Sequence, residues 1–409
     1  MTSVMRSDDV RKSNRRRVLG AVRRQDGLSR TDIQRKTGLS AATVSAITSN
    51  LIAEGVLIYP DTKRSAGAGR GRPKVALALN PDTALVGTLI FRHNIISAAV
   101  TNYAGQTVGE ETIEIVTAEA SPKELRLALC RCMEQAIQRT GRASVHLQRI
   151  SIGIQGVIDI DGAIMLWSPI SRQTDLPIKQ WLEDHFAAPT HVSNDCDMIA
   201  RALNWRDPLR YGRNFAAVLL ADGVGMGLLL RGQMINGTRS SGTEFGHMTY
   251  LPGGALCRCG SFGCIEAYAS AYAIDRRATG GHEDQLPPEP QGAYNIDAIA
   301  NAARNGDRQS RIAIETAGDA IGTGLANIYA LVDPFPIIMV GSGVVAFDLM
   351  EGSIRRALRA NVAGKQVENI PIDCFTDEYP LVREGCMISA LLAHDEQIAD
   401  FGSIPEVVS

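Results

Sequence analysis

The strongest constraint in this sequence is one histidine followed by three cysteines within eighteen residues, at His247, Cys257, Cys259 and Cys264. One imidazole and three thiolates are a complete tetrahedral ligand set for zinc. Four glycines between the first and the last of them allow the backbone to turn tightly enough for the side chains to converge. Because four protein ligands leave no position for a reacting water, we expect a structural zinc that closes a loop. The alternative is a group of unpaired thiols that are close only by chance.

Length and composition indicate a globular protein of several domains. The chain has 409 residues, 45% of them hydrophobic, which is enough for two or three domains with buried cores. It begins without the apolar segment of a signal peptide, and it has no run of eighteen apolar residues that could span a membrane. The five other cysteines have no spacing typical of disulfides, which suits a reducing compartment. We therefore expect a cytoplasmic protein with no membrane contact.

The net charge of −2 hides a strong division along the chain. Residues 1–80 contain 16 Lys and Arg against 6 Asp and Glu, whereas the remainder contains 26 basic and 38 acidic residues. A basic balance of this size favours a polyanionic partner for the N-terminal segment, and no such partner for the rest.

The basic segment has the pattern of three helices. Residues 13–24 predict the first, Ser29 can cap a short second helix, and Gly38 can turn the chain into a third that begins after Ser40. Helix, glycine turn and helix of these lengths are typical of helix-turn-helix proteins that bind double-stranded DNA. An ordinary three-helix subdomain is the alternative. The outer face of the third helix would present small side chains to the major groove: Ser40, Ala41, Thr43, Ser45 and Ser49.

A glycine-rich basic loop between two apolar strands follows these helices and completes the pattern of a winged helix over residues 1–79. Within this loop, Arg70, Gly71 and Arg72 resemble the core of an AT-hook, in which an extended Arg-Gly-Arg lies in a narrow minor groove. Such grooves occur in A·T-rich DNA, where the negative potential attracts arginine. The alternative is a flexible basic linker that contacts only phosphates.

From residue 80 onward, β-branched runs alternate with helical patterns, which predicts an α/β fold. A polar, proline-rich segment at 279–294 is interpreted as a surface insertion. The expected strands are 85–90, 95–101, 149–154, 190–193, 215–220, 227–231 and 337–340. The expected helices are 122–140, 196–205, 265–277, 296–305 and 312–332.

Four motifs in this region together resemble the ROK family of repressors and sugar kinases. They read I-G-I-Q-G-V-I-D, S-N-D-C-D, G-T-E-F-G-H-M-T and C-R-C-G-S-F-G-C-I-E-A-Y-A-S. The resemblance implies a two-lobed actin-like ATPase fold with sugar bound between the lobes. A winged helix placed before this fold resembles the repressor branch, which regulates glucose, N-acetylglucosamine and xylose metabolism. We expect lobe 1 at 80–195, completed by a C-terminal helix at 385–409, and lobe 2 at 196–384 with the zinc loop and an oligomerisation surface.

The resemblance also indicates that this chain is not an enzyme. The family's kinases carry Asp-x-Gly-Gly-Thr, whose glycines let a hairpin approach the ATP phosphates. Here Leu89 stands at the position of the Asp, and Phe91, Arg92 and His93 replace Gly-Gly-Thr. A second phosphate loop, normally Gly-Thr-Gly, reads Ala-Asp-Gly at 221–223 and puts a carboxylate beside the expected phosphates.

The positions that contact sugar in the family are largely kept. They are Asn194, Asp195, Glu244, His247 and Glu266. Asp195 matches the kinases' general base, and without ATP it can only bind. The kinases' Ser-Pro-Asn-Leu reads Ser-Pro-Ile-Ser at 168–171, which removes one hydroxyl contact. The alternative is that these polar groups form hydrogen-bonded core structure around the zinc loop.

These observations together predict a DNA-binding transcriptional regulator, a repressor of carbohydrate uptake or metabolism genes. We expect a homodimer or tetramer on a palindromic, A·T-rich operator, because each winged helix reads one half-site. A sugar or sugar phosphate that favours closed lobes would release the DNA. Two alternatives remain open at this point: sequestration by a protein partner, and an active sugar kinase with an added DNA-binding domain.

Overall fold

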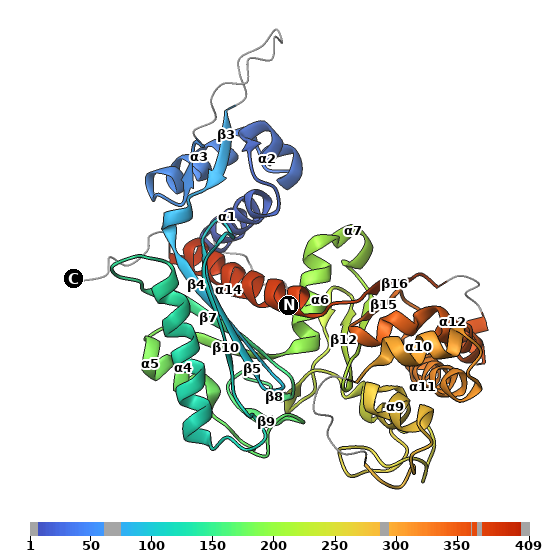
Figure 1. Cartoon of the computed structure of the whole chain (residues 1–409). Coiled ribbons are helices and arrows are strands. Elements are labelled where there is room, and N and C mark those ends of the chain that lie inside the picture. The colour runs from blue at the N-terminus through green and yellow to red at the C-terminus, as the bar shows by residue number, and fades with distance from the viewer. Residues whose placement is uncertain (1–6, 61–74, 287–293, 361, 366–369, 402–409) are drawn as a thin grey trace.

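The computed structural model describes residues 7–60, 75–286, 294–360, 362–365 and 370–401. Its ribbon has three parts, a small N-terminal domain above two larger lobes that lie side by side (Figure 1). None of the described helices is long and apolar enough to cross a membrane.

The N-terminal domain packs three helices against a three-stranded sheet of order β1-β3-β2. Ser29 caps the second helix in a capping box with Asp32, as each side chain accepts a hydrogen bond from the other's backbone. Gly38 ends that helix at φ 66°, which glycine adopts without strain. The elements are α1 (Ser7–Arg24), β1 (Leu28–Ser29), α2 (Arg30–Thr37), α3 (Ala41–Ala53), β2 (Leu57–Ile58) and β3 (Ala76–Leu79).

This arrangement confirms the predicted winged helix. Strands β2 and β3 pair antiparallel, as the two strands of a wing do. Residues 61–74 of the connection between them, which include Arg70, Gly71 and Arg72, lie outside the described residues.

The two lobes are built on five-stranded sheets of the same topology. Counted along the chain, the first strand of each sheet pairs antiparallel with the second strand and parallel with the fourth. The spatial orders are β10-β7-β4-β5-β6 and β13-β12-β11-β15-β16. Lobe 1 contains β4 (Leu85–Arg92), β5 (Ile95–Asn102), β6 (Thr107–Glu114), β7 (Leu147–Ile154) and β10 (Thr190–Asn194). Lobe 2 contains β11 (Phe215–Leu220), β12 (Val224–Leu230), β13 (Gln233–Met234), β15 (Ile337–Val340) and β16 (Ile372–Phe375).

Helices cover both faces of each sheet, which confirms the predicted α/β fold. On β4, Leu89 and Phe91 face a core shared with α4 and α5, whereas Val86 and Ile90 face the opposite side. This alternation follows the two-residue period of a strand. The helices of lobe 1 are α4 (Pro122–Arg139) and α5 (Ile178–Phe186). The helices of lobe 2 are α8 (Glu266–Ala269), α9 (Ala271–Ala278), α10 (Ile296–Arg304), α11 (Arg308–Val332), α12 (Phe347–Leu358) and α13 (Val362–Lys365).

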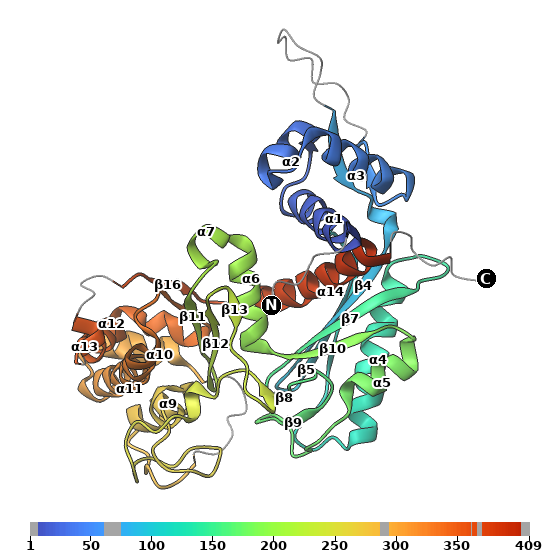
Figure 2. The same ribbon diagram turned by 180° about the vertical axis from the view of Figure 1, so that it is seen from behind.

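Further elements connect these parts. Helices α6 (Asp195–Arg206) and α14 (Tyr379–Phe401) pack on each other between the two large sheets (Figure 2). A small sheet joins β14 (Ser240–Ser241) of lobe 2 to β8 (Val157–Asp159) and β9 (Met165–Trp167) of lobe 1. A short helix, α7 (Pro208–Tyr211), follows α6.

Several predicted elements differ from the structure. The helix expected at 265–277 is broken at Ser270, whose extended backbone (φ −69°, ψ 161°) separates α8 from α9. The next N–H, of Ala271, donates to the Ala221 carbonyl at 2.9 Å instead of continuing the helix.

Some element bounds also differ. The strand expected at 227–231 begins at Val224, which pairs with Leu220 of β11. The helices expected at 312–332 and 385–409 begin at Arg308 and Tyr379.

The N-terminal domain is fixed to lobe 1 by α14. Val18, Leu19 and Val22 of α1 share one apolar core with α14 residues such as Leu391 and Ile398. Within this interface Arg23 donates to the Asp395 carboxylate, and the Tyr103 hydroxyl donates to the same group at 2.5 Å. Arg23 and Asp395 are only 5% and 8% exposed.

Replacing Asp395 with Ala should strongly destabilise this interface. The change would leave the Arg23 guanidinium buried without its carboxylate, which costs roughly 3–5 kcal/mol. Asp400→Ala is the control, because Asp400 pairs with Arg16 where the two are 32% and 49% exposed, and such a pair contributes less than about 1 kcal/mol. Urea unfolding of the full chain measures both; equal losses would contradict the role given to Asp395.

Candidate functional site

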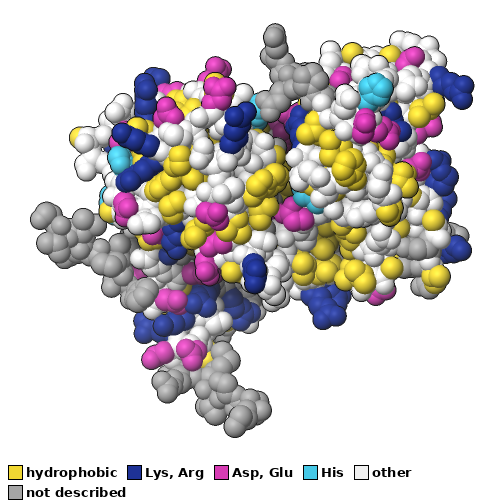
Figure 3. All heavy atoms as spheres, turned by 90° about the horizontal axis from the view of Figure 1, so that it is seen from below, with side chains coloured by type: hydrophobic (Ala, Val, Ile, Leu, Met, Phe, Trp, Pro, Cys, Tyr) yellow, Lys and Arg dark blue, Asp and Glu magenta, His cyan; other side chains and the backbone are white. Residues whose placement is uncertain are grey.

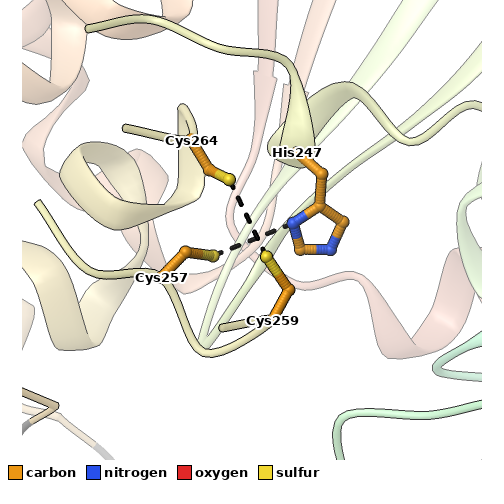
Figure 4. A group of neighbouring side chains, drawn as sticks. All are labelled: His247, Cys257, Cys259 and Cys264. Carbon is orange, nitrogen blue, oxygen red and sulfur yellow. Dashed lines mark hydrogen bonds between the residues drawn. The ribbon is translucent and has the colours of Figure 1, made fainter. Parts of the chain in front are cut away.

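The four predicted metal ligands converge in the structure. His247 ends a 3-10 turn (Phe245–His247), Cys257 and Cys259 lie on the following loop, and Cys264 precedes α8. Their four ligand atoms lie within 4.8 Å of one another, and the side chains point to a common centre (Figure 4). Cys257 Sγ is 3.8 Å from His247 Nδ1, and Cys259 Sγ is 3.8 Å from Cys264 Sγ. A tetrahedron with metal–sulfur bonds of about 2.3 Å has edges of about 3.8 Å, so this cluster could hold a metal ion.

The backbone of the loop explains how the ligands are brought together. Leu256 and Phe262 form an isolated antiparallel bridge, and the Cys257 N–H donates to the Ser261 carbonyl at 2.9 Å. Gly263 has φ 85°, and a Cβ there would lie 1.9 Å from the Leu251 carbonyl oxygen. The loop can therefore close only with glycine at this position.

Burial opposes ionisation of two of the thiols. It raises the pKa of Cys257 well above its ordinary value and the pKa of Cys264 to about 11. The pKa of Cys259 is lowered, because hydrogen bonds from Ser261 outweigh the effect of burial. Since thiolates are the form that ligates metal, a cation bound here would have to displace the protons of Cys257 and Cys264.

The five predicted sugar-contacting residues line one small cavity between the lobes. Its volume is about 80 Å³, and Trp167 of β9 forms part of its wall. Asp195 is the first residue of α6 and follows β10, so the end of a strand and the start of a helix hold its carboxylate at the cavity. His247 Nε2 lies 3.8 Å from Glu244 Oε2, while Nδ1 faces the cysteines. One imidazole thus belongs to both the metal cluster and the cavity.

Two of these residues also have structural roles. Asn194 caps α6, as its Oδ1 accepts from the Cys196 N–H and its Nδ2 donates to the Gly156 carbonyl, both at 2.8 Å. Glu266 accepts from the Val224 N–H at 3.2 Å and from the Cys257 thiol at 3.5 Å. The polar groups therefore serve the local fold as well as the cavity, which is the alternative that the sequence left open for them.

The turn that would hold nucleotide phosphates in the family's kinases is filled with side chains. Leu89 and Phe91 are fully buried in the core of lobe 1. The β4–β5 turn passes through Asn94 at φ 56°. The side-chain oxygen of Asn94 accepts a hydrogen bond from the Thr117 N–H. Arg92 and Asp222 line a second, larger cavity of about 430 Å³ beside the first.

Several residues of this second cavity were not predicted. Glu378 and Tyr379 come from the start of α14, and Tyr294 comes from the segment interpreted as a surface insertion. Residues 287–293 of that segment lie outside the described chain. Its first part is attached to the zinc loop, because the Leu256 N–H donates to the Glu283 carbonyl at 2.7 Å. For Tyr294, the only signal that the sequence offered was the residue type itself.

The predicted DNA-contacting residues of α3 lie on one accessible side of the domain. Ala41, Ser45 and Ser49 are exposed, while Val44, Ile47 and Leu51 are buried beneath them. Ser40 instead caps the helix, because its hydroxyl accepts from the Thr43 N–H at 3.1 Å and lies 2.8 Å from the Thr43 hydroxyl. Asn50, which the sequence analysis omitted, is also exposed on α3, and its amide is suited to adenine.

Replacing Asp195 with Asn should flatten the pH dependence of stability between about pH 4 and 7. Burial raises the pKa of Asp195 from 3.8 to about 7, so the folded chain keeps a proton that the unfolded chain releases. Stability from this group is therefore present at low pH and is lost as pH rises toward 7. The slope is at most about 1.4 kcal/mol per pH unit, because the group exchanges one proton.

Urea unfolding at several pH values measures this slope. Asp161→Asn, at an exposed position, is the control. Burial also raises the pKa of Asp197 to about 7, so part of the wild-type slope should remain in Asp195→Asn. Identical slopes for this variant and the wild type would show that Asp195 does not titrate in this range.

Comparison with known proteins agrees with both parts of the molecule. Residues 93–378 match the ROK family, and residues 11–58 match winged helix-turn-helix DNA-binding domains. The chain is 25% identical over 404 residues to the xylose repressor of Caldicellulosiruptor bescii, covering 97% of this chain and 98% of the repressor. It is 24% identical over 369 residues to the DNA-binding transcriptional dual regulator NagC of Escherichia coli, covering 89% of each.

A solved structure extends this likeness to the whole fold. The crystal structure of a ROK family transcriptional regulator, a homologue of the E. coli Mlc protein, has a TM-score of 0.75 and 22% identity. The match covers 96% of this chain and 98% of that one. The chain therefore belongs to the ROK family and carries a winged helix-turn-helix DNA-binding domain ahead of its ROK lobes.

Proposed function

We propose that this protein is a cytoplasmic transcriptional repressor of carbohydrate uptake or metabolism genes, released from DNA by a sugar or sugar phosphate bound between its lobes. The observation that carries the proposal is the position of α14. One end of this helix lines the cleft between the lobes, and the other end packs against the DNA-binding domain. The names of two relatives that cover most of this chain, a xylose repressor and a DNA-binding transcriptional dual regulator, support a role in transcription.

The arrangement favours binding over phosphoryl transfer. Leu89 and Phe91 stand where a kinase would have a carboxylate and a glycine, but they are buried in the core of lobe 1, and Asp222 adds a negative charge to the larger cavity. The groups around Asp195 can still bind hydroxyls, because carboxylates accept hydrogen bonds from a polyol.

Helix α14 provides a physical route from the cleft to the DNA-binding domain. Its 23 residues span about 34 Å. Tyr379 and Val382 line the larger cavity at its start, whereas the Ile398 carbonyl and Asp400 accept hydrogen bonds from Arg15 and Arg16 near its end. A ligand that favours one arrangement of the lobes would therefore also move the docking surface of α1.

The DNA-binding mode follows from the domain. We propose that α3 enters the major groove and that Arg70, Gly71 and Arg72 of the wing contact an A·T-rich minor groove. Two copies in a homodimer would read a palindromic operator. In this proposal the DNA-binding domain ends at about residue 79 and lobe 1 ends at about residue 195. Lobe 2 follows and supplies the oligomerisation surface.

We further propose that the cluster of one histidine and three cysteines binds zinc in a structural role. Its donor set and its spacing both fit that ion. The metal would fix the His247 ring and the loop that leads into α8, which begins at Glu266.

Replacing Cys264 with Ser should therefore lower the thermal midpoint of the protein by at least about 5 °C and abolish bound zinc. Cys374→Ser is the control, since Cys374 is an exposed cysteine outside the cluster. Differential scanning calorimetry and elemental analysis of the purified full chain measure the two effects. A wild-type protein purified without metal, and as stable as Cys264→Ser, would refute the zinc site.

Replacing Asp195 with Ala should give a repressor that binds its operator normally but cannot be released. The change lies far from α3 and removes only the contact that distinguishes the bound and free states. A coupling of about 1–3 kcal/mol would make operator affinity change 5- to 150-fold on sugar binding in the wild type and not in the variant.

The operator can be obtained by in vitro selection with the purified protein. Fluorescence anisotropy of that DNA then reports release by a panel of hexoses, pentoses, amino sugars, their 6-phosphates and disaccharides. The proposed control of DNA binding by a sugar would be contradicted in two cases. In one, the same sugar releases the Asp195→Ala variant from the operator; in the other, none of the sugars releases the wild type.

A further inference from the structure

The cavity that contains Asp195 continues into a much larger one. The small cavity measures about 80 Å³ and the adjoining cavity about 430 Å³. Asp195, Glu266, Gly223 and Gln155 line both, so a ligand seated at Asp195 meets open space on its far side. Seen from below, the groove between the two lobes is visible with acidic side chains at its edge (Figure 3).

The walls of the larger cavity are formed by side chains, including Arg92 at a position where the family's kinases carry glycine. The Arg92 guanidinium lies 4.8 Å from the centre of the Tyr379 ring. On the opposite wall, Arg258 donates to the Tyr294 hydroxyl at 3.0 Å and lies 4.4 Å from the centre of the Tyr272 ring. Among the described residues, the buried Nε of Arg92 has no hydrogen-bond partner. Aromatic faces and planar donors thus line the space.

The charges of this cavity disfavour a phosphate group. Its carboxylates are Asp195, Asp222, Glu266 and Glu378, whereas its guanidinium groups are only Arg92 and Arg258, and the exposed His93 adds at most one further charge. Burial raises the pKa of Glu378, and the neighbouring carboxylates of Asp377 and Asp222 raise it further. A phosphate dianion would add to this repulsion.

Hydroxyl groups suit the same walls much better. They donate to carboxylates and accept from guanidinium groups, so each wall residue can be satisfied without added charge. The C–H faces of a sugar ring can rest on the tyrosine rings, and the cavity volume falls within the range of sites for larger small molecules.

We infer that the effector is a neutral disaccharide, with one ring against Asp195 and Glu244 and the second ring in the larger cavity between Arg92, Tyr379, Tyr294 and Glu378. The inference rests on the proposed function and names its ligand class. The second ring occupies the space that a nucleotide would need in a kinase, and it contacts the first turn of α14 directly. Loss of phosphate binding and gain of a longer sugar ligand then have one structural cause.

Ligand-induced thermal shifts and calorimetric titrations of the full chain test this without DNA. The probes are glucose, galactose, xylose, glucose 6-phosphate, and the disaccharides maltose, cellobiose, melibiose, lactose, sucrose and trehalose. At least one disaccharide should bind about 10-fold or more tightly than its component monosaccharides, and glucose 6-phosphate should bind no more tightly than glucose.

Variants locate the second ring. Glu378→Gln should weaken the disaccharide about 10-fold, as expected for loss of a charged hydrogen-bond acceptor, and leave monosaccharide binding within about 2-fold. Tyr379→Ala should act in the same direction, and Tyr379→Phe should retain most of the affinity because it keeps the ring. Glu396→Gln, an exposed position on the same helix, is the matched control.

The outcomes separate this inference from the proposed function. If monosaccharides bind and disaccharides bind no better, the sugar-controlled repressor stands and the disaccharide is wrong. Tightest binding of glucose 6-phosphate would likewise overturn the neutral ligand. If no sugar binds, both proposals fail together.

Discussion

The packing of α14 is the constraint on which the rest of the structure depends. Leu381, Val382 and Cys386 belong to the core between the two large sheets, whereas Leu391 and Ile398 belong to the core shared with the DNA-binding domain. One rigid helix is therefore part of two hydrophobic cores, and neither core can rearrange without moving it. The buried Asp395 fixes the rotation of the helix, because its carboxylate has to meet both Arg23 and Tyr103.

This constraint was largely invisible in the sequence, while other features were clear in it. Caps at Ser29 and Ser40 and the turn at Gly38 act through neighbouring residues, so the helix-turn-helix could be predicted from local pattern alone. The metal cluster could be predicted for the same reason, since its ligands lie within one loop. The pairing of Arg23 with Asp395 joins residues 372 positions apart, and no local pattern encodes it.

The cleft shows the same division between local and long-range information. Asp195 and Glu266 were found through short motifs, and both line the cavities. Tyr294 and Glu378 reach the same space from distant segments, and only the fold brings them there. The break at Ser270 was missed for a related reason: its neighbours have a helical pattern, but the Ala271 N–H donates to the distant Ala221 carbonyl instead of continuing the helix.

The proposed zinc would affect the cavity mainly through Glu266. This carboxylate accepts hydrogen bonds from the Cys257 thiol and from the Val224 N–H, at the start of β12. Binding of a metal to Cys257 as thiolate would remove the thiol proton and free one oxygen of Glu266. His247 would bind the same metal through Nδ1, which faces the cysteines, while Nε2 would stay on the cavity side, 3.8 Å from Glu244. An ion in this position would thus determine which polar atoms line the cavity.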